Sequence, residues 1–167
     1  MGFDYQWENK EASFGPPVKK QVDGGTHISF EILLRKNGKF IALRRPEAIP
    51  GHEMPLHAHK NPKGLLYFCH NLIRYGESAE ECVKRIVKDQ AGVSVKKITF
   101  VYLDSSVQEK DNQWAIIPCV VADIEKIPKP GRYGNEVTEI VSFDKQTIPN
   151  DFGWWSQKDL KEFLKEL

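Results

Sequence analysis

The segment from residue 71 to residue 93, NLIRYGESAEECVKRIVKDQAGV, constrains the fold of this chain more than any other. Ser78 is followed three residues later by Glu81, the spacing of a capping box at a helix N-terminus. Apolar residues then recur at spacings of three and four, on one face of the expected helix: Ala79, Cys82, Val83, Ile86 and Val87. Gly92 can adopt the left-handed conformation that ends many helices. The segment therefore predicts a loop, an amphipathic helix packed on a core, and a second loop.

The charged and glycine residues of this segment resemble the Nudix box. That pattern is Gly, five residues, Glu, seven residues, Arg-Glu-apolar-any-Glu-Glu, any residue, Gly, apolar. The positions that match it are Glu77, Arg85, Val87, Gly92 and Val93. The positions that depart from it are Asn71 for the first Gly, Ile86 for the Glu after Arg85, and Asp89 and Gln90 for the Glu pair. The departures fall on the residues that carry the chemistry of the family.

The resemblance implies an α/β protein, an α/β/α sandwich with a mixed sheet, in a single domain over residues 26–167. Residues 27–34 and 40–43 are predicted strands, and Asn37-Gly38 between them is a strong signal for a type I′ hairpin. Residues 1–25 are expected to form an N-terminal arm whose aromatic side chains pack on the domain: Phe3, Tyr5, Trp7 and Phe14.

Further strands are predicted at 65–69, 98–103, 114–122 and 137–143 from apolar runs bounded by polar loops. A terminal helix is expected over residues 156–167, capped by Ser156 and Asp159. Its apolar residues share one face: Leu160, Phe163, Leu164 and Leu167.

In the family that the box resembles, the last three box carboxylates bind Mg²⁺ or Mn²⁺, which bridges a pyrophosphate. Magnesium prefers hard oxygen ligands in near-octahedral geometry. Ile86 offers no ligand, Gln90 offers a neutral amide oxygen, and Asp89 is shorter than Glu. On a helical wheel Ile86 and Gln90 fall within the apolar stripe, and Asp89 lies at its edge. We therefore expect an ordinary amphipathic core helix instead of an intact metal site.

The resemblance implies catalytic roles for Glu77, Arg85 and Asp89, with Asp89 and Glu77 as metal ligands only if the protein is active. Glu77 and Arg85 are also spaced to hold one another, which would preserve the fold of the box without catalysis. The family draws one more acid from outside the box, and the candidates are Glu109, Asp111, Glu136 and Glu139.

The loop before the box carries His52, His57 and His59, which allow two interpretations. Imidazoles suit zinc and other transition metals, although this spacing matches no structural zinc pattern. Alternatively the loop contacts phosphate, because Arg and protonated His donate to such groups. The candidate ligand-binding residues are Arg44, Arg45, His57, His59 and Arg74. A solvated loop whose charges bind nothing is equally compatible with the sequence.

The composition excludes several classes of function. A formal net charge of +1 argues against a large nucleic-acid interface. No apolar run approaches a membrane span. Three scattered cysteines in apolar or helical runs (Cys69, Cys82 and Cys119) predict buried, reduced thiols in a cytoplasmic protein. A homodimer stays open.

The first functional hypothesis is a Nudix-like protein that binds a nucleotide or another phosphorylated ligand with weak or no pyrophosphohydrolase activity. The second is an active Nudix pyrophosphohydrolase that uses Asp89 and acids outside the box. The third is a protein-interaction or regulatory module on the same scaffold. Four aromatic residues could stack on a base or fill the core: Trp114, Tyr133, Trp154 and Trp155.

Overall fold

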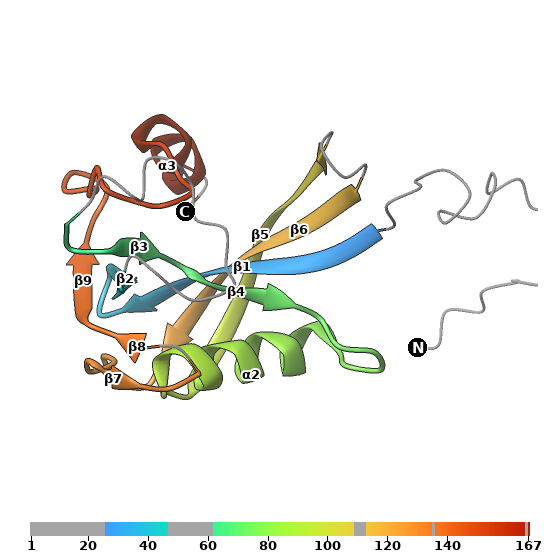
Figure 1. Ribbon diagram of the computed structural model, residues 1–167, viewed down its shortest axis with the longest axis horizontal. Helices are drawn as coiled ribbons and strands as arrows, with labels where there is room; N and C mark the ends of the chain where they lie inside the picture. Colours follow the sequence, from blue (N-terminus) through green and yellow to red (C-terminus); the bar gives the residue numbers. More distant parts are fainter. Residues whose placement is uncertain (1–25, 47–61, 109–112, 135, 166) are drawn as a thin grey trace, which may run out of the picture.

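The computed structural model describes residues 26–46, 62–108, 113–134, 136–165 and 167. These residues build a mixed seven-stranded sheet with one helix on each face (Figure 1). The predicted α/β/α sandwich with a mixed sheet is therefore confirmed. Residues 1–25, for which the sequence predicts an N-terminal arm, lie outside the described residues. The same holds for His52, His57 and His59 of the loop before the box.

Strand β1 (Thr26–Lys36) and strand β2 (Lys39–Arg45) form the predicted hairpin. Asn37 and Gly38 have φ angles of 52° and 75°, which a type I′ turn requires at both central residues. The apolar character of both strands follows from their place at the centre of the sheet, where both faces are covered.

Strand β1 organises the rest of the sheet. It runs parallel to β6 (Gln113–Ile124), which pairs antiparallel with the edge strand β5 (Val95–Gln108). On its other side β1 pairs with β4 (Cys69–Leu72) along its first half and with β2 along its second half. Strands β3 (Leu65–Tyr67) and β9 (Glu139–Phe143) both pair with β2.

Two predicted strands are each divided in the structure. The strand expected at 65–69 is β3 and β4, because the chain leaves β2 after Tyr67 and joins β1 at Cys69. The strand expected at 137–143 is β8 (Glu136–Val137) and β9, and β8 pairs with β7 (Gly131–Arg132) in a small separate sheet. Both divisions depend on partners that are distant in sequence, so local periodicity could not reveal them.

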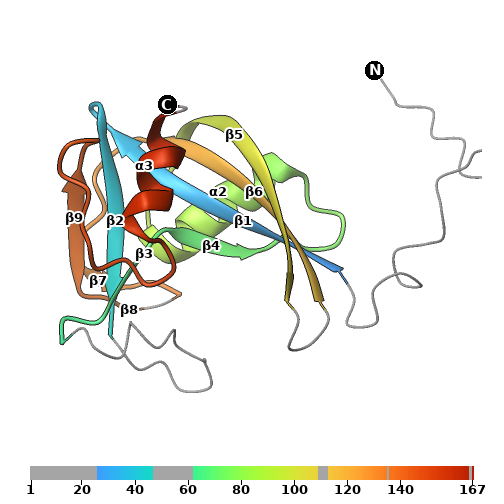
Figure 2. The same ribbon diagram turned by 90° about the horizontal axis from the view of Figure 1, so that it is seen from above.

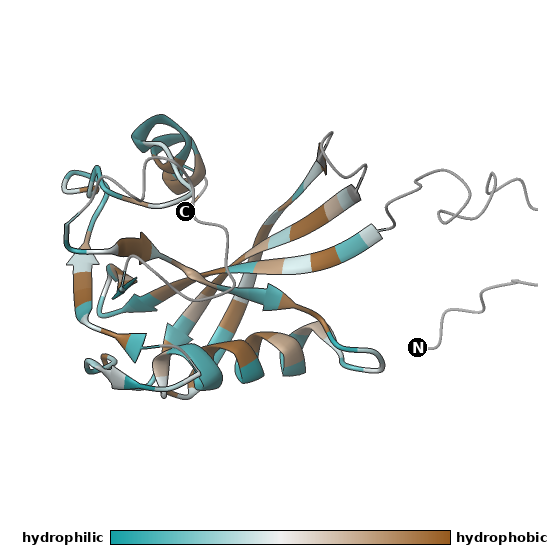
Figure 3. Cartoon of the chain, viewed as in Figure 1, coloured by the Kyte–Doolittle hydropathy of each residue, from teal (hydrophilic) through white to brown (hydrophobic). Residues whose placement is uncertain are grey.

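The two faces of the sheet are covered by different helices. Helix α2 (Ala79–Ala91) packs Cys82, Val83, Ile86 and Val87 against Phe30, Ile32 and Leu34 of β1. Helix α3 (Gln157–Lys165) packs Leu160, Phe163 and Leu164 over the opposite face, against Leu33, Phe40 and Ala42. Figure 2, which views the molecule from above, shows α3 lying across β1 and β2. The alternation of hydrophobic and hydrophilic residues along the strands is visible in Figure 3.

Both predicted helix caps are present. Ser78 and Glu81 form a reciprocal capping box, and Gly92 ends α2 with a φ of 66°. The Ser156 hydroxyl accepts a hydrogen bond from the Asp159 backbone at 3.1 Å. The three cysteines are buried and free, as predicted. Within the described ranges, no helix combines the length and the apolar character that a membrane crossing requires.

Candidate functional site

Helix α2 carries the positions that correspond to Arg-Glu-apolar-any-Glu-Glu of the Nudix box, and its inner face belongs to the core. Ile86 has no exposed surface and packs among the apolar residues between α2 and the sheet. Asp89, three residues later, is exposed on the outer side of the helix. The helical-wheel prediction for both residues is therefore confirmed.

Gln90 is buried and holds the backbone of β4. Its amide nitrogen Nε2 donates to the His70 carbonyl at 2.7 Å, and its oxygen Oε1 accepts from the His70 N–H at 3.1 Å. Both polar atoms of the amide are thereby used in a two-way hydrogen bond that fixes α2 to the sheet. A carboxylate at this position could accept the N–H but would face the carbonyl without a proton to donate.

Glu77 and Arg85 form the predicted ion pair at the start of α2. The guanidinium donates to both carboxylate oxygens, from Nε at 2.6 Å and from Nη2 at 2.8 Å. Arg85 also donates to the Leu72 carbonyl, and Glu77 accepts from the Arg74 N–H. The hydrogen bond from Arg85 lowers the pKa of Glu77 to about 2. The pair ties the loop before α2 to the helix, a structural role that needs no metal.

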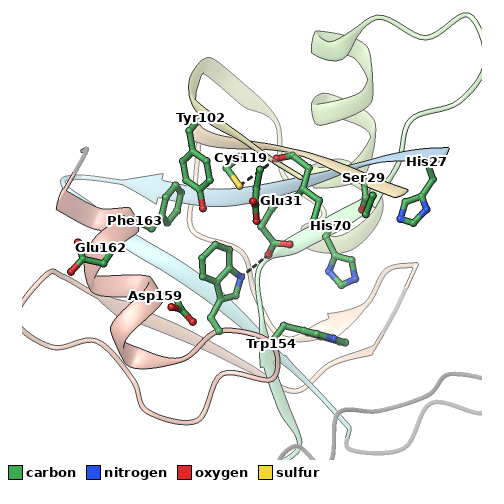
Figure 4. Close-up of a pocket in the computed structure, with 14 residues that line it drawn as sticks. His27, Ser29, Glu31, His70, Tyr102, Cys119, Trp154, Asp159, Glu162 and Phe163 are labelled. Atoms are coloured by element: carbon green, nitrogen blue, oxygen red, sulfur yellow. Dashed lines mark hydrogen bonds between the residues drawn. The ribbon is translucent and has the colours of Figure 1, made fainter. Parts of the chain in front are cut away.

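A cavity of about 770 Å³ opens on the opposite face of the sheet, beneath α3. This volume is within the range of small-molecule sites. Its floor is formed by alternate residues of β1, β5 and β6, and its walls by the segment before α3 and by α3 itself (Figure 4). Among the described residues, four carboxyl side chains line it: Glu31, Asp104, Asp159 and Glu162.

Strand register aligns four side chains across the floor of this cavity. Glu31 of β1 stands opposite His70 of β4 on one side and Cys119 of β6 on the other, and Cys119 stands opposite Tyr102 of β5. All four line the cavity. Burial raises the pKa of Glu31 to about 8, and a hydrogen bond from Trp155 only partly offsets that rise. Burial therefore favours the neutral form of this carboxyl up to a higher pH than for an exposed glutamate.

The aromatic wall of the cavity is positioned by a tight bend. Gly153 donates to the Leu66 carbonyl at 2.8 Å, and a Cβ atom at this residue would lie 1.9 Å from Leu65. This close approach orients the two tryptophans that follow. Trp155 stacks on Phe163 of α3 at 5.5 Å between ring centres and donates its indole N–H to Glu31 at 3.2 Å.

Trp154 is 46% exposed at the rim of the same cavity. Its ring meets His70 edge-on at 5.2 Å, and the guanidinium of Arg45 lies 5.0 Å from its centre. Arg45 is itself buried and lies 4.9 Å from the ring of Tyr67 on its other side. The exposed tryptophan is thus backed by a cation and held in place at the cavity mouth.

Solved structures of the Nudix hydrolases share this architecture. A MutT NUDIX hydrolase from Burkholderia pseudomallei superposes with a TM-score of 0.59 at 12% identity, over 85% of this chain and 98% of that one. A mutant of the Bacillus subtilis pyrophosphohydrolase BsRppH gives 0.57 at 21% identity, over 83% and 78% of the two chains. The chain has the Nudix fold. No protein-family model matches the sequence, and no curated protein does.

Three of the box positions of this Nudix fold are engaged in contacts within the protein. Ile86 lies in the core, the Gln90 amide is bound to the His70 backbone, and Glu77 is bound to Arg85. Asp89 is the one box carboxylate left on the exposed side of α2. Within the described part of the chain, no three His, Cys, Asp or Glu side chains are grouped to hold a metal ion.

Of the four acids predicted outside the box, the structure describes Glu136 and Glu139. Glu139 accepts from Arg44 at 2.6 Å, and Glu136 is exposed on β8. Glu109 and Asp111 lie outside the described residues. Glu139 is therefore already paired with a cation, whereas Glu136 belongs to the segment that contacts the end of α2, where the Gly134 N–H donates to the Asp89 carbonyl.

The predicted ligand-binding arginines occupy three different settings. Arg44 is buried and pairs with Glu139 at 2.6 Å and with Asp151 at 2.8 Å, so its charge is already balanced. Arg45 is stacked between two aromatic rings, and Arg74 is exposed in the loop before α2. His57 and His59 lie outside the described residues. Phosphate contacts by these residues stay a prediction.

Sequence reasoning overlooked Glu31 as a candidate site residue. The available signal was a single acid inside an apolar strand, ISFEILL, on the face that alternates with Phe30 and Ile32. An ionisable residue in such a strand either pairs with a cation or faces a cavity. Trp154 and Trp155 were among the aromatic residues expected either to stack on a base or to fill the core, and their sequence positions did not show that they join Glu31 at one cavity.

Proposed function

We propose that this protein binds a nucleotide or another phosphorylated ligand at the cavity beneath α3 and hydrolyses it weakly or not at all. The proposal rests on the residues that occupy the box positions of helix α2. Two of its three carboxylate positions are occupied by residues that hold the fold together, Ile86 in the core and Gln90 on the His70 backbone. The Nudix fold and a cavity of suitable volume support the binding half of the proposal.

The loss of hydrolysis follows from the chemistry of phosphoanhydrides. Cleavage at neutral pH depends on metal ions that stabilise charge on the phosphates and activate water. Each absent carboxylate lowers metal occupancy and disturbs the alignment of the attacking water, for which small displacements are costly. Binding does not depend on these residues, because the cavity lies on the other face of the sheet from α2.

Binding and turnover are tested separately on the full chain. Calorimetry in EDTA measures the affinity for ADP-ribose, dinucleoside polyphosphates and nucleoside triphosphates. Phosphate release from the same compounds is measured with millimolar Mg²⁺ or Mn²⁺. We expect binding without metal to at least one compound, and no phosphate release above that of buffer.

The variant Asp89→Ala decides between the hypotheses, with Lys88→Ala as the matched control on the same exposed turn. Robust turnover by the wild type and by Lys88→Ala, abolished by Asp89→Ala, would establish an enzyme with a rebuilt metal site. Neither binding nor turnover of any compound would favour an interaction module on the same scaffold. Cytoplasmic location and a homodimer stay predictions.

A further inference from the structure

The chemistry of the cavity beneath α3 is opposite to that of a phosphate site. Its described lining holds four carboxyl groups and neither lysine nor arginine. Phosphate oxygens placed among these acids would meet like charge in a partly enclosed space. The part of a ligand that enters the cavity is therefore expected to be uncharged or cationic, and to carry a group that can donate a hydrogen bond to a carboxyl oxygen.

The aromatic lining of the cavity favours a flat ring. Trp154 stands at the rim, Trp155 and Phe163 line the walls, and Tyr102 lies on the floor. Aromatic walls stack on heterocycles with little dependence on the sequence or type of base. The bottom of the cavity is the row of side chains across the sheet, in which Glu31 lies between His70 and Cys119.

Glu31 can offer both carboxyl oxygens to such a ring, because Oε1 keeps one of its two acceptor positions when Trp155 donates to it. Trp155 donates to Oε1 at 3.2 Å and is the only hydrogen-bond partner of this carboxyl within the described residues. Oε2 therefore has no protein partner there, although the side chain lines the cavity floor. A half-buried polar atom that points into a cavity is a group that a ligand can satisfy.

We propose that the cavity binds an amino-substituted nucleobase, with the ring against Trp154 and its amino edge hydrogen-bonded to Glu31. The carboxyl oxygen accepts from the exocyclic amino group, and the protonated oxygen donates to the neighbouring ring nitrogen. Adenine and cytosine present this pair of atoms side by side. The phosphates of the ligand lie outside the acidic cavity. The inference rests on the proposed function and names the part of the ligand that this site selects.

The protonation state of Glu31 agrees with this pairing. Since its pKa is about 8, the neutral acid is present at pH 7 and can both donate and accept. Above pH 8 the carboxyl group of Glu31 loses its proton and can no longer donate. The carboxylate oxygen then faces the lone pair of the ring nitrogen, so the affinity for the base falls. The other titratable side chains at the cavity are His27, His70, Tyr102, Asp104, Asp159 and Glu162, and Cys69 and Cys119 lie beside Glu31.

The first test compares adenosine with purine riboside, which differs only by lacking the amino group. Neither compound carries phosphate, so neither tests the proposed function. Calorimetry on the full chain at pH 7 should give about two- to tenfold tighter binding of adenosine, the worth of one hydrogen bond between neutral groups. Equal affinities would overturn the inference.

The second test follows adenosine affinity from pH 6.5 to 9.5 in the wild type and in Glu31→Gln. The wild-type affinity should be constant below pH 7 and fall at least about fivefold by pH 9.5, following the lost proton. The amide of Glu31→Gln mimics the neutral acid, so its affinity should stay within about threefold of wild type at pH 7 and lose this pH dependence. The same fall in Glu31→Gln would assign the titration to another group and overturn the role of Glu31.

Two further variants complete the design. Glu31→Leu should bind adenosine and purine riboside equally, and thermal unfolding checks that it is folded. Glu80→Gln, an exposed acid on the opposite face of the sheet, should behave as wild type in every assay.

If ADP-ribose binds but adenosine does not, the inference falls and the proposed function stands. If adenosine binds with the expected preference and phosphorylated compounds do not, the proposed function falls alone.

Discussion

At position 86, the isoleucine side chain lies between α2 and the sheet with no exposed surface. The variant Ile86→Glu, which restores the box residue, should destabilise the protein by at least about 3 kcal/mol at pH 7, because the new carboxylate would be buried without a partner. Urea unfolding measures this loss. The loss should shrink as pH falls, since burial raises the pKa of the introduced group and the folded state then takes up the proton. Lys88→Glu on the exposed face is the control, and a neutral Ile86→Glu would contradict the buried position of this residue.

At position 90, the amide is matched to both polar groups of the His70 backbone. The variant Gln90→Glu keeps the acceptor but loses the donor, and it should cost about 1–3 kcal/mol at neutral pH. Its folded-state pKa should be raised, because only the protonated acid can donate to the His70 carbonyl. Stability relative to wild type should therefore recover as pH falls below that pKa. Chemical unfolding at several pH values checks this, and equal stability at all pH values would show that the amide is not needed.

At the scale of the element, α2 depends on the pair between Glu77 and Arg85. The pKa of Glu77 is lowered to about 2, below its unfolded value of 4.5, so the pair contributes stability above pH 4.5 that is lost as pH falls toward 2. The variant Glu77→Gln should lower the melting temperature at pH 7. The difference in melting temperature between variant and wild type should then shrink as pH falls from 4.5 toward 2. Glu80→Gln, which disturbs only an exposed pair with Lys84, should have little effect at any pH. A difference that persisted at pH 2 would show that the carboxylate charge is not the cause.

Also at this scale, the helices were predictable because their signals are local. The capping box at Ser78 and Glu81, the stripe through Ile86 and the final Gly92 all lie within one segment, and the structure confirms each. The division of the strand after Tyr67 was not predictable. It arises because β3 and β4 pair with different strands, and pairing partners so distant in sequence leave no periodic trace.

At the scale of the whole molecule, the cavity was not predictable for the same reason. Glu31, His70 and Cys119 are brought into one row by the register of three strands, and the bend at Gly153 brings Trp155 to them from the far end of the chain. The sequence located the helix whose box carboxylates are replaced. It could not show that a separate, acidic cavity lies on the other face of the sheet.

The central claim is that the molecule binds a nucleotide without cleaving it, and one sample can test both halves. Phosphorus NMR of ADP-ribose, mixed with an equal amount of the protein and millimolar Mg²⁺, reports on binding through the shift and width of the two phosphate signals. The same spectra report on cleavage through the appearance of monophosphate signals. We predict shifted or broadened pyrophosphate signals that persist over many hours. Monophosphate signals that grow with time, and that are absent with Asp89→Ala, would contradict the account.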